Sequence, residues 1–294
     1  MTLKSWLQRL PGIRTFVESR RDLMAIRHDV AATRRQTEQA LHATSAAFVE
    51  QLLASPRYAD PRVLARYELR VHSQTGEDGI LAEVFRRVGT TDRFFVEFGI
   101  ESGVETNTTL LLRQGWSGVW VDGDSTAVAS ARQRFAREIA EGRLTIIEAM
   151  VTSTNAAALM ASAHVPAHFD LLSLDIDRNT YHLWEALHAY HPRVTVVEYN
   201  ASFGPTADWV VDLDDAAMWD GSVVFGASLA AYARHGTQRG DALVGCTLNG
   251  SNAFFVQSSL TADHFASPFT AERHWEPPRY WLHWRGGHPT ASLR

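Results

Sequence analysis

Five short apolar segments alternate with helical segments in the middle of the chain, and this alternation constrains the fold more than any other feature. The apolar segments are rich in β-branched residues and lie at 94–99, 118–122, 144–149, 169–175 and 194–198. Segments with helical character separate them, at 106–114, 126–141, 155–163 and 181–190. Strands that alternate with helices form a parallel sheet with right-handed crossovers. The sequence therefore predicts an α/β fold.

Two further strands are predicted after a helix at about 227–235. Residues 242–247 and 252–257 are apolar, and the connection between them contains Asn249-Gly250. An Asn-Gly pair between two such segments is a strong signal for a β-hairpin. We therefore expect seven strands, of which five are parallel and the last two form an antiparallel hairpin.

The N-terminal part has a different pattern. From Thr15 to about Leu53 there is no Pro or Gly, and Ala, Arg, Gln and Glu are frequent, which predicts a helix. Small or apolar residues recur at alternating three- and four-residue steps: Leu23, Ile26, Val30, Thr33, Thr37, Ala40 and Ala47. This seam is typical of a coiled coil, although Thr and Ala weaken it. It fits an oligomerisation helix and a helix packed on its own domain equally well.

These patterns divide the chain into three parts. We expect a helical extension over 1–69, an α/β domain over 70–257 and an aromatic tail over 258–294 that packs on the domain or its acceptor site.

Charge and cysteine content restrict the class of protein. The chain has a formal net charge of −5, with +5 in residues 1–70 and −10 in the remainder, and an acidic body argues against a nucleic-acid enzyme. The one cysteine, Cys246, cannot form an intrachain disulfide, which fits a reducing compartment. No apolar run reaches the roughly 18 residues of a membrane span, and the first residues lack the apolar core of a signal peptide. We expect a cytoplasmic protein with no transmembrane segment.

A glycine-containing turn follows the first predicted strand. Residues 97–103 read EFGIESG, and glycines let a backbone approach a ligand closely. Their spacing is G-x-x-x-G, not the G-x-G-x-x-G of dinucleotide-binding proteins, and a tight structural turn is an alternative explanation. The second strand ends at Asp122, where a carboxylate can accept hydrogen bonds from both hydroxyls of a ribose. Together the two features indicate an adenosyl ligand.

The order of these motifs resembles that of the class I S-adenosylmethionine-dependent methyltransferases, and within them the FkbM-like branch. The residues that carry the resemblance are SQTGEDG (73–79), VEFGIESG (96–103) with Asn107-Thr108, GWSGVWVDGD (115–124), LLSLDIDRNTYHLW (171–184), VEYN (197–200) and NAFFV (252–256). They span about residues 70–257. The resemblance implies a Rossmann-like seven-stranded sheet and S-adenosylmethionine as the cofactor.

The same resemblance implies roles for particular residues. The cofactor-binding set is Gln74, Glu97, Gly99, Gly103, Asn107, Asp122, Met150 and Asp175. Asp122 would bind the ribose, and Gln74 and Asn107 the methionine portion. Met150 would cover the adenine or belong to the core. Glu77 and Asp78 could simply begin a helix, where carboxylates suit the helix dipole.

Acidic residues gather at the ends of the fourth and fifth predicted strands. Asp175 and Asp177 flank Ile176, and Glu198 and Asn200 end the next strand. Neighbouring strands lie about 4.8 Å apart, so these oxygens could converge on Mg²⁺ or another divalent cation. A comparable group binds metal in some sugar and macrolide O-methyltransferases that this segment resembles. As alternatives, Asp175 contacts only the cofactor, Asp177 is a base and Glu198 pairs with an arginine.

A hydroxyl nucleophile needs a base, and the candidate catalytic residues are Asp177 first, then His182, together with Asp175. In the family pattern Gly-Asn-Asp usually follows, whereas this chain has Arg178-Asn179-Thr180. The lost acid and the gained cation weaken the metal hypothesis and could signal an anionic substrate.

Two aromatic segments are candidates for the acceptor site. The segment from Ala201 to Gly226 contains Trp209, Trp219, Phe225 and five aspartates, and long loops of this kind are often lids. The tail contains His274, Trp275, Tyr280, Trp281, His283 and Trp284, whose aromatic faces suit sugar rings or cover apolar surface. The spacing of its histidines, His288 included, does not predict a zinc site.

We therefore expect an O-methyltransferase that transfers a methyl group to a hydroxyl of a sugar, glycan or glycosylated metabolite, with or without a divalent metal. Homo-oligomers would form through the N-terminal helix. The alternatives are a non-catalytic assembly or binding protein on the same fold and a hydroxylase-like enzyme of that fold. A nicotinamide dehydrogenase is a more distant alternative, because its glycine fingerprint is missing.

Overall fold

The computed structural model describes residues 11–282. Its fold is built on a seven-stranded sheet in the order β3-β2-β1-β4-β5-β7-β6. The first five strands are parallel, and β7 lies antiparallel between β5 and β6. The strands are β1 (Phe94–Phe98), β2 (Ser117–Asp122), β3 (Leu144–Glu148), β4 (His168–Leu174), β5 (His191–Glu198), β6 (Asp241–Cys246) and β7 (Asn252–Gln257). This arrangement confirms the predicted Rossmann-like fold with a terminal hairpin.

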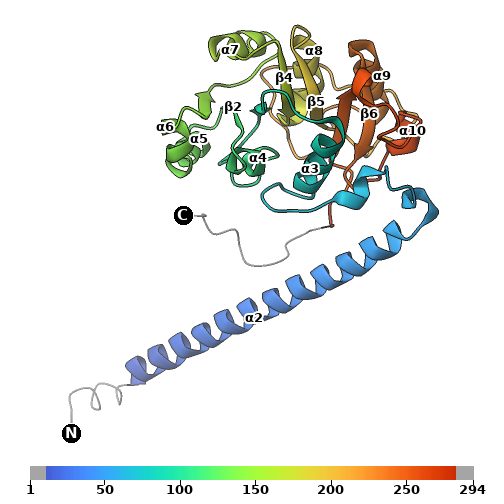
Figure 1. Cartoon of the computed structure of the whole chain (residues 1–294). Helices are drawn as coiled ribbons and strands as arrows, with labels where there is room; N and C mark the ends of the chain where they lie inside the picture. Colours follow the sequence, from blue (N-terminus) through green and yellow to red (C-terminus); the bar gives the residue numbers. More distant parts are fainter. Residues whose placement is uncertain (1–10, 283–294) are drawn as a thin grey trace. The chain divides into compact units, whose positions relative to one another are not determined.

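Helices cover both faces of the sheet (Figure 1). One face packs against α3 (Glu77–Val88), α4 (Thr109–Arg113) and α5 (Ser125–Arg134), and the other against α7 (Ala156–Ser162), α8 (Thr180–Ala186) and α9 (Leu229–Arg239). Each face has its own buried apolar cluster. Because strands with two covered faces have no solvent-facing side, they are continuously apolar, which is why the sequence showed them clearly.

Helix boundaries differ from the prediction where side chains make specific contacts. The predicted helix at 106–114 begins only at Thr109, because the backbone N–H groups of Asn107 and Thr108 donate to the Glu97 carboxylate instead. The predicted helix at 126–141 is divided at Phe135 into α5 and α6 (Ala136–Ala140). The Phe135 ring is buried edge-on against Trp120, at 4.7 Å between ring centroids.

The strand register brings four carboxyl ends to one edge of the sheet. Phe98 of β1 pairs with Val121 of β2 on one side and with Leu174 of β4 on the other, and Leu174 pairs with Val197 of β5. Strand order reverses between β1 and β4, and such a switch point is where open α/β sheets bind ligands. Most of the predicted site residues follow these four strands.

The chain divides into two units, Met1–Gln51 and Leu52–Arg294. Helix α2 (Pro11–Leu53) runs through the first unit (Figure 1). It has 43 residues and begins before Thr15, the predicted start of the helix. No helix within residues 11–282 is long and apolar enough to cross a membrane.

Segments on both sides of residues 70–257 belong to the second unit. They contain η1 (Pro56–Tyr58), η2 (Leu64–Tyr67), η4 (Ser258–Leu260) and α10 (Ala271–His274). Leu64 and Phe265 are buried in the cluster that also contains residues of α3. The predicted boundaries at 69/70 and 257/258 stay predictions. His283, Trp284 and His288 of the predicted tail lie outside the described residues.

Candidate functional site

The two glycines of the turn after β1 are required by the packing of the fold. Gly99 has a φ of +79°, and a Cβ there would lie 1.6 Å from the carbonyl oxygen of Asp175. Gly103 has a φ of +71°, and its Cβ would lie 2.8 Å from the rings of Phe135 and Trp120. The structural explanation of these glycines therefore holds, and it places the turn directly against the end of β4.

Glu97 supports this turn from inside. Its buried carboxylate accepts hydrogen bonds from the backbone N–H groups of Asn107 (2.9 Å) and Thr108 (3.2 Å), from the Thr108 hydroxyl and from Ser173 Oγ (3.2 Å). Burial raises the pKa of Glu97 to about 7, against the opposing effect of these donors. The side chain of Asn107 donates to Ser173 Oγ at 3.0 Å. These contacts fix the loop between β1 and α4.

Asp122 is half-buried at the end of β2, beside the glycine turn. Its Oδ2 accepts from the N–H of Glu101 at 2.7 Å, and its Oδ1 accepts from the N–H of Asp124 at 2.8 Å. Each carboxylate oxygen can accept more than one hydrogen bond, so both can still accept from hydroxyl groups. Met150 is 57% exposed, and its sulfur would lie 3.2 Å from a Cβ on Gly123. Met150 therefore lies on the surface beside Asp122 and is not a core residue.

Gln74 is exposed on a tightly fixed segment. The Asp78 carboxylate accepts from the backbone N–H groups of residues 71–73 at 2.6–2.8 Å, and α3 begins at Glu77, as the helix-start explanation of these two acids predicts. An ion pair of 2.7 Å joins Arg70 to Glu105, next to the glycine turn. The segment before α3 and the turn after β1 are thus neighbours.

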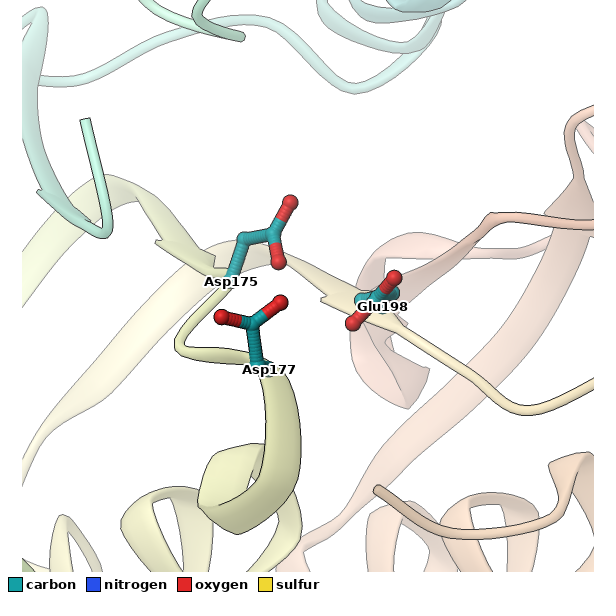
Figure 2. A group of neighbouring side chains, drawn as sticks. All are labelled: Asp175, Asp177 and Glu198. Carbon is teal, nitrogen blue, oxygen red and sulfur yellow. The ribbon is translucent and has the colours of Figure 1, made fainter. Parts of the chain in front are cut away.

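Asp175, Asp177 and Glu198 converge beyond the ends of β4 and β5 (Figure 2). One carboxylate oxygen from each lies within 4.8 Å of the others. The register that pairs Leu174 with Val197 puts Asp175 beside Glu198, and Asp177, with a φ of +56°, turns its side chain back toward both. Among the side chains that the structure describes, no arginine or lysine is ion-paired with these three carboxylates. We refer to them as the acidic cluster.

The acidic cluster binds protons more tightly than ordinary carboxylates. Burial, followed by the negative charges of Asp177 and Glu97, raises the pKa of Asp175 to about 7. Burial and the charges of Asp175 and Asp177 raise the pKa of Glu198 well above its usual range, and Glu198 also shares a hydrogen bond with Asp175. Partial burial raises the pKa of Asp177. Uncompensated negative charge of this kind favours either a proton or a bound cation.

Asn200, a predicted metal ligand, makes its hydrogen bonds to the loop at 201–226. Its Nδ2 donates to the carbonyl oxygens of Val223 (2.7 Å) and Phe225 (3.0 Å), and its Oδ1 accepts from the N–H of Ser202 at 3.1 Å. Because the buried Asn200 side chain is bonded to both ends of the loop, it holds these ends together.

The turn after Asp177 also holds this loop. Arg178 donates to the carbonyl oxygens of Asp212 (3.2 Å) and Val224 (3.5 Å), and Asn179 donates to that of Asp214 (2.8 Å). His182 Nε2 lies 2.8 Å from the carbonyl oxygen of Val211. Arg178, where the resemblance implied a glycine, thus has a structural explanation, because it holds the loop. Sequence reasoning missed it, because the partners are backbone atoms that no residue type reveals.

Sequence reasoning also missed Glu276, which fixes the C-terminal segment. Its buried carboxylate accepts from the Tyr58 hydroxyl at 2.8 Å to each oxygen and pairs with Arg279 at 2.8 Å. Its backbone carbonyl accepts from the hydroxyl of Tyr199, at 2.8 Å. We refer to these contacts of Glu276 as the clamp. Because Tyr199 directly follows Glu198, the clamp attaches the tail next to the acidic cluster.

Tyr280 of the tail interacts electrostatically with the acidic cluster. Burial and the neighbouring Glu198 carboxyl group raise the pKa of Tyr280, while a hydrogen bond to the backbone of Ala201 acts in the opposite direction. The side chain is 46% exposed. A partly exposed aromatic side chain therefore lies within electrostatic reach of Glu198.

No family model and no curated protein matches the chain. Among solved structures, a Staphylococcus aureus protein assigned as a caffeoyl-CoA O-methyltransferase has a TM-score of 0.42 at 12% identity, covering 60% of this chain and 81% of its own. An assigned O-methyltransferase from Klebsiella pneumoniae has a TM-score of 0.41 at 17% identity, covering 74% and 97%. The O-methyltransferase from Bacillus cereus in complex with SAH has a TM-score of 0.38 at 13% identity, covering 74% and 89%. The description of the fold rests on the strand order and register given above.

Proposed function

We propose that the chain is an S-adenosylmethionine-dependent O-methyltransferase of the FkbM-like type that methylates a hydroxyl of a sugar, glycan or glycosylated metabolite. The observation that carries the proposal is the contact between Gly99 and the backbone of Asp175. Through it, the candidate cofactor turn and the acidic cluster share one edge of the sheet at its switch point. A cofactor held by the turn would present its reactive group to an acceptor held at the cluster.

Each candidate residue has a distinct part in this scheme. The carboxylate of Asp122 would bind the ribose hydroxyls, Met150 would cover the adenine, and Gln74 and Asn107 would hold the methionine portion. Glu97 keeps the loop that carries Asn107 in place. S-adenosylmethionine supplies a methyl group on a positively charged sulfur, which the acceptor oxygen displaces.

Asp177 is the base in this proposal. The Asp177 carboxylate would accept the proton that the acceptor hydroxyl loses when its oxygen takes the methyl group. Partial burial raises the pKa of Asp177, and a carboxylate with a raised pKa is a more effective base. His182 is the weaker candidate, because its Nε2 is occupied by the carbonyl oxygen of Val211.

The acidic cluster fits a hard divalent cation. Three carboxylates lie close enough to share one ion, and no basic side chain of the described residues neutralises them. Mg²⁺ bound there would lower the pKa of an acceptor hydroxyl. In this metal-assisted form of the proposal, Asp175, Asp177 and Glu198 would be the ligands, and the ion would activate the hydroxyl in place of Asp177 as a base. Asn200 would act through the loop that it holds.

The surroundings of the cluster support a carbohydrate acceptor. Tyr280 borders it from the tail, and the loop at 201–226 carries exposed aromatic surface at Trp219. Aromatic rings at the rim of a polar site suit the apolar faces of sugars. The net charge of −10 outside residues 1–70 makes a nucleic-acid acceptor unfavourable.

We also place the protein in the cytoplasm and assign homo-oligomerisation to the N-terminal helix. The single cysteine, Cys246, is buried and free, which suits a reducing compartment. The exposed seam of α2 supports homo-oligomerisation through this helix.

Calorimetric titration of the full chain with S-adenosylmethionine and S-adenosylhomocysteine, with and without Mg²⁺, tests the proposal. We expect binding in the micromolar range for both compounds. Absence of binding under both conditions would refute a methyltransferase and favour the assembly protein. For a compound that is turned over, mass spectrometry separates the remaining alternatives, because methylation adds about 14 mass units and hydroxylation about 16.

A further inference from the structure

The seam of α2 is exposed along its length. Leu23, Ile26 and Val30 are 60%, 58% and 62% exposed, and the residues that continue the seam, Thr33, Thr37 and Ala40, are exposed as well. A helix does not keep three large aliphatic side chains in water without cost, and most helical stability in proteins comes from packing an apolar face. The seam therefore requires a partner with a matching narrow stripe.

Heptad positions on this helix follow directly from the seam. Leu23, Val30 and Thr37 occupy position a, and Ile26, Thr33 and Ala40 occupy position d. Along the seam, the flanking e positions are Arg27, Arg34 and Leu41, and the flanking g positions are Asp22, Asp29 and Gln36. The four charged residues are exposed. Over residues 22–34 the apolar stripe is thus two residues wide and bounded by charge, which suits two strands better than a larger bundle.

The signs of these charges specify the orientation of the partner. In a parallel pair, each g residue faces the e residue of the next heptad on the other helix. Asp22 then meets Arg27 of the second copy, and Asp29 meets Arg34 of the second copy. In an antiparallel pair, g faces g and e faces e, which would oppose Asp to Asp and Arg to Arg. Arg34 also contacts Glu38 of its own helix at 3.0 Å, and its guanidinium has further donors to share.

We propose that α2 is a parallel, two-stranded coiled coil formed with a second copy of this chain, centred on residues 22–41. The occupant of the exposed seam is the same helix of the partner, held in register by two g-to-e ion pairs on each side. Thr and Ala in the second half leave little apolar volume at the seam, so the dimer is reversible. This inference rests on the proposed homo-oligomerisation through the N-terminal helix and is independent of methyl transfer.

Sedimentation of the full chain tests the association. We expect a species of twice the 32.8 kDa chain mass that dissociates on dilution over roughly 1–100 µM. Val30→Asp places a charge in the seam and should leave only monomer. Ala31→Asp, one position further and exposed, is the matched control and should leave the dimer unchanged. A monomer at the highest concentration, more than two chains, or a dimer that survives Val30→Asp would overturn the proposal.

Charge reversal tests the orientation. Asp22→Arg with Asp29→Arg should raise the dissociation constant about tenfold or more, since four attractive contacts become repulsive. Adding Arg27→Asp and Arg34→Asp should restore the dimer, because every g-to-e pair is again opposite in sign. An antiparallel pair would be insensitive to the first change, since Arg would replace Asp on both sides of the same contact.

Disulfide trapping gives a second, independent readout of register. Thr37→Cys at position a would face its own copy in a parallel dimer, and oxidation should cross-link it. Gln39→Cys at position c points away from the seam and is the matched control. The native Cys246 is buried and should not contribute. Failure of the Thr37 variant to cross-link, while the wild-type chain is dimeric, would overturn the parallel arrangement.

Discussion

Two acidic residues at the ends of neighbouring strands have opposite surroundings. Glu97, at the end of β1, is enclosed and satisfied by donors from its own loop. Asp122, at the end of β2, is half-buried and bound only to backbone N–H groups of the adjacent turns. Hence Asp122 has the carboxylate that can still meet a ligand, and in the proposed function Glu97 would act through the loop that it fixes.

Asp122→Ala should weaken the binding of S-adenosylhomocysteine. A hydrogen bond to a charged acceptor contributes about 1.5–3 kcal/mol, so loss of the ribose contact should raise the dissociation constant roughly 10- to 100-fold. Isothermal calorimetry measures this change. Glu148→Ala removes a carboxylate at the end of the next strand, β3, and is the control that should bind normally. Equal affinity of the Asp122 variant and the wild type would remove Asp122 from the cofactor site.

Stability should depend on pH through Asp175. Because the folded-state pKa, about 7, exceeds that of an unfolded aspartate, folding favours the protonated form. The stability from this group is complete below about pH 4 and is lost as pH rises through 7. Asp175→Asn cannot ionise, so the variant should gain several degrees in Tm over the wild type at pH 8 and little at pH 4.

Differential scanning calorimetry at both pH values gives this comparison, with Mg²⁺ as a second variable. Mg²⁺ should raise the Tm of the wild type at pH 8 and should not raise that of Asp175→Asn, which lacks one carboxylate of the cluster. A variant that is less stable than the wild type at pH 8 would contradict the unfavourable burial of this charge.

Sequence reasoning located these residues but not their contacts. Acids at strand ends are visible in the sequence, since buried strands are easily recognised and the residue after each lies at the sheet edge. The 1.6 Å conflict that forbids a side chain at Gly99 depends on how closely β4 approaches, which a single strand does not encode. For the same reason the sequence could not distinguish the enclosed Glu97 from the accessible Asp122.

The loop at 201–226 borders the candidate site. Its end at Gly226 passes the carbonyl oxygens of Asp177 and Glu198, each 4.0 Å from a Cβ built there. Asn200 and Arg178 hold it by its carbonyl groups. The position of the loop is therefore coupled to the two strand ends that carry the acidic cluster.

Asn200→Ala should release this loop without unfolding the domain. Three hydrogen bonds are lost, and their part-buried backbone partners are left to hydrate, which favours local opening. Chymotrypsin, which can cut at Trp219 and Phe225, should cleave the loop several times faster than in the wild type. Arg132→Ala, which breaks an exposed ion pair on α5, is the control. An unchanged cleavage rate would show that the amide does not hold the loop.

Strands were easier to predict than helix ends or this loop. A strand buried on both faces needs only an apolar run, which is local information. The predicted helix at 126–141 is divided at Phe135 because that ring packs on Trp120. Helix α4 begins late because the backbone N–H groups before it donate to the Glu97 carboxylate. Both depend on residues from other elements, so periodicity alone could not give them.

At the scale of the whole molecule, the contacts of Glu276 join the first and last segments of the second unit, because Tyr58 lies near its start and Arg279 near its end. Glu276→Ala would leave Arg279, 14% exposed, without its carboxylate and Tyr58 without its acceptor. Breaking a buried pair from one side costs about 3–5 kcal/mol, so Tm should fall by roughly 6–15 °C in a unit of this size. Glu272→Ala, an exposed residue of the same tail, should change Tm little. A fall of similar size in both variants would show that the clamp has no special role.

The division of the chain at Gln51 and Leu52 predicts that the second unit folds alone. Within the described residues, both apolar clusters begin at or after Leu64, so none of their members belongs to α2. A protein of residues 52–294 should keep its Tm within about 2 °C. It should bind S-adenosylhomocysteine like the full chain and sediment as a monomer. If deletion weakens cofactor binding while the Tm is kept, the helix contributes to the site, and assembly and catalysis are not separable in this molecule.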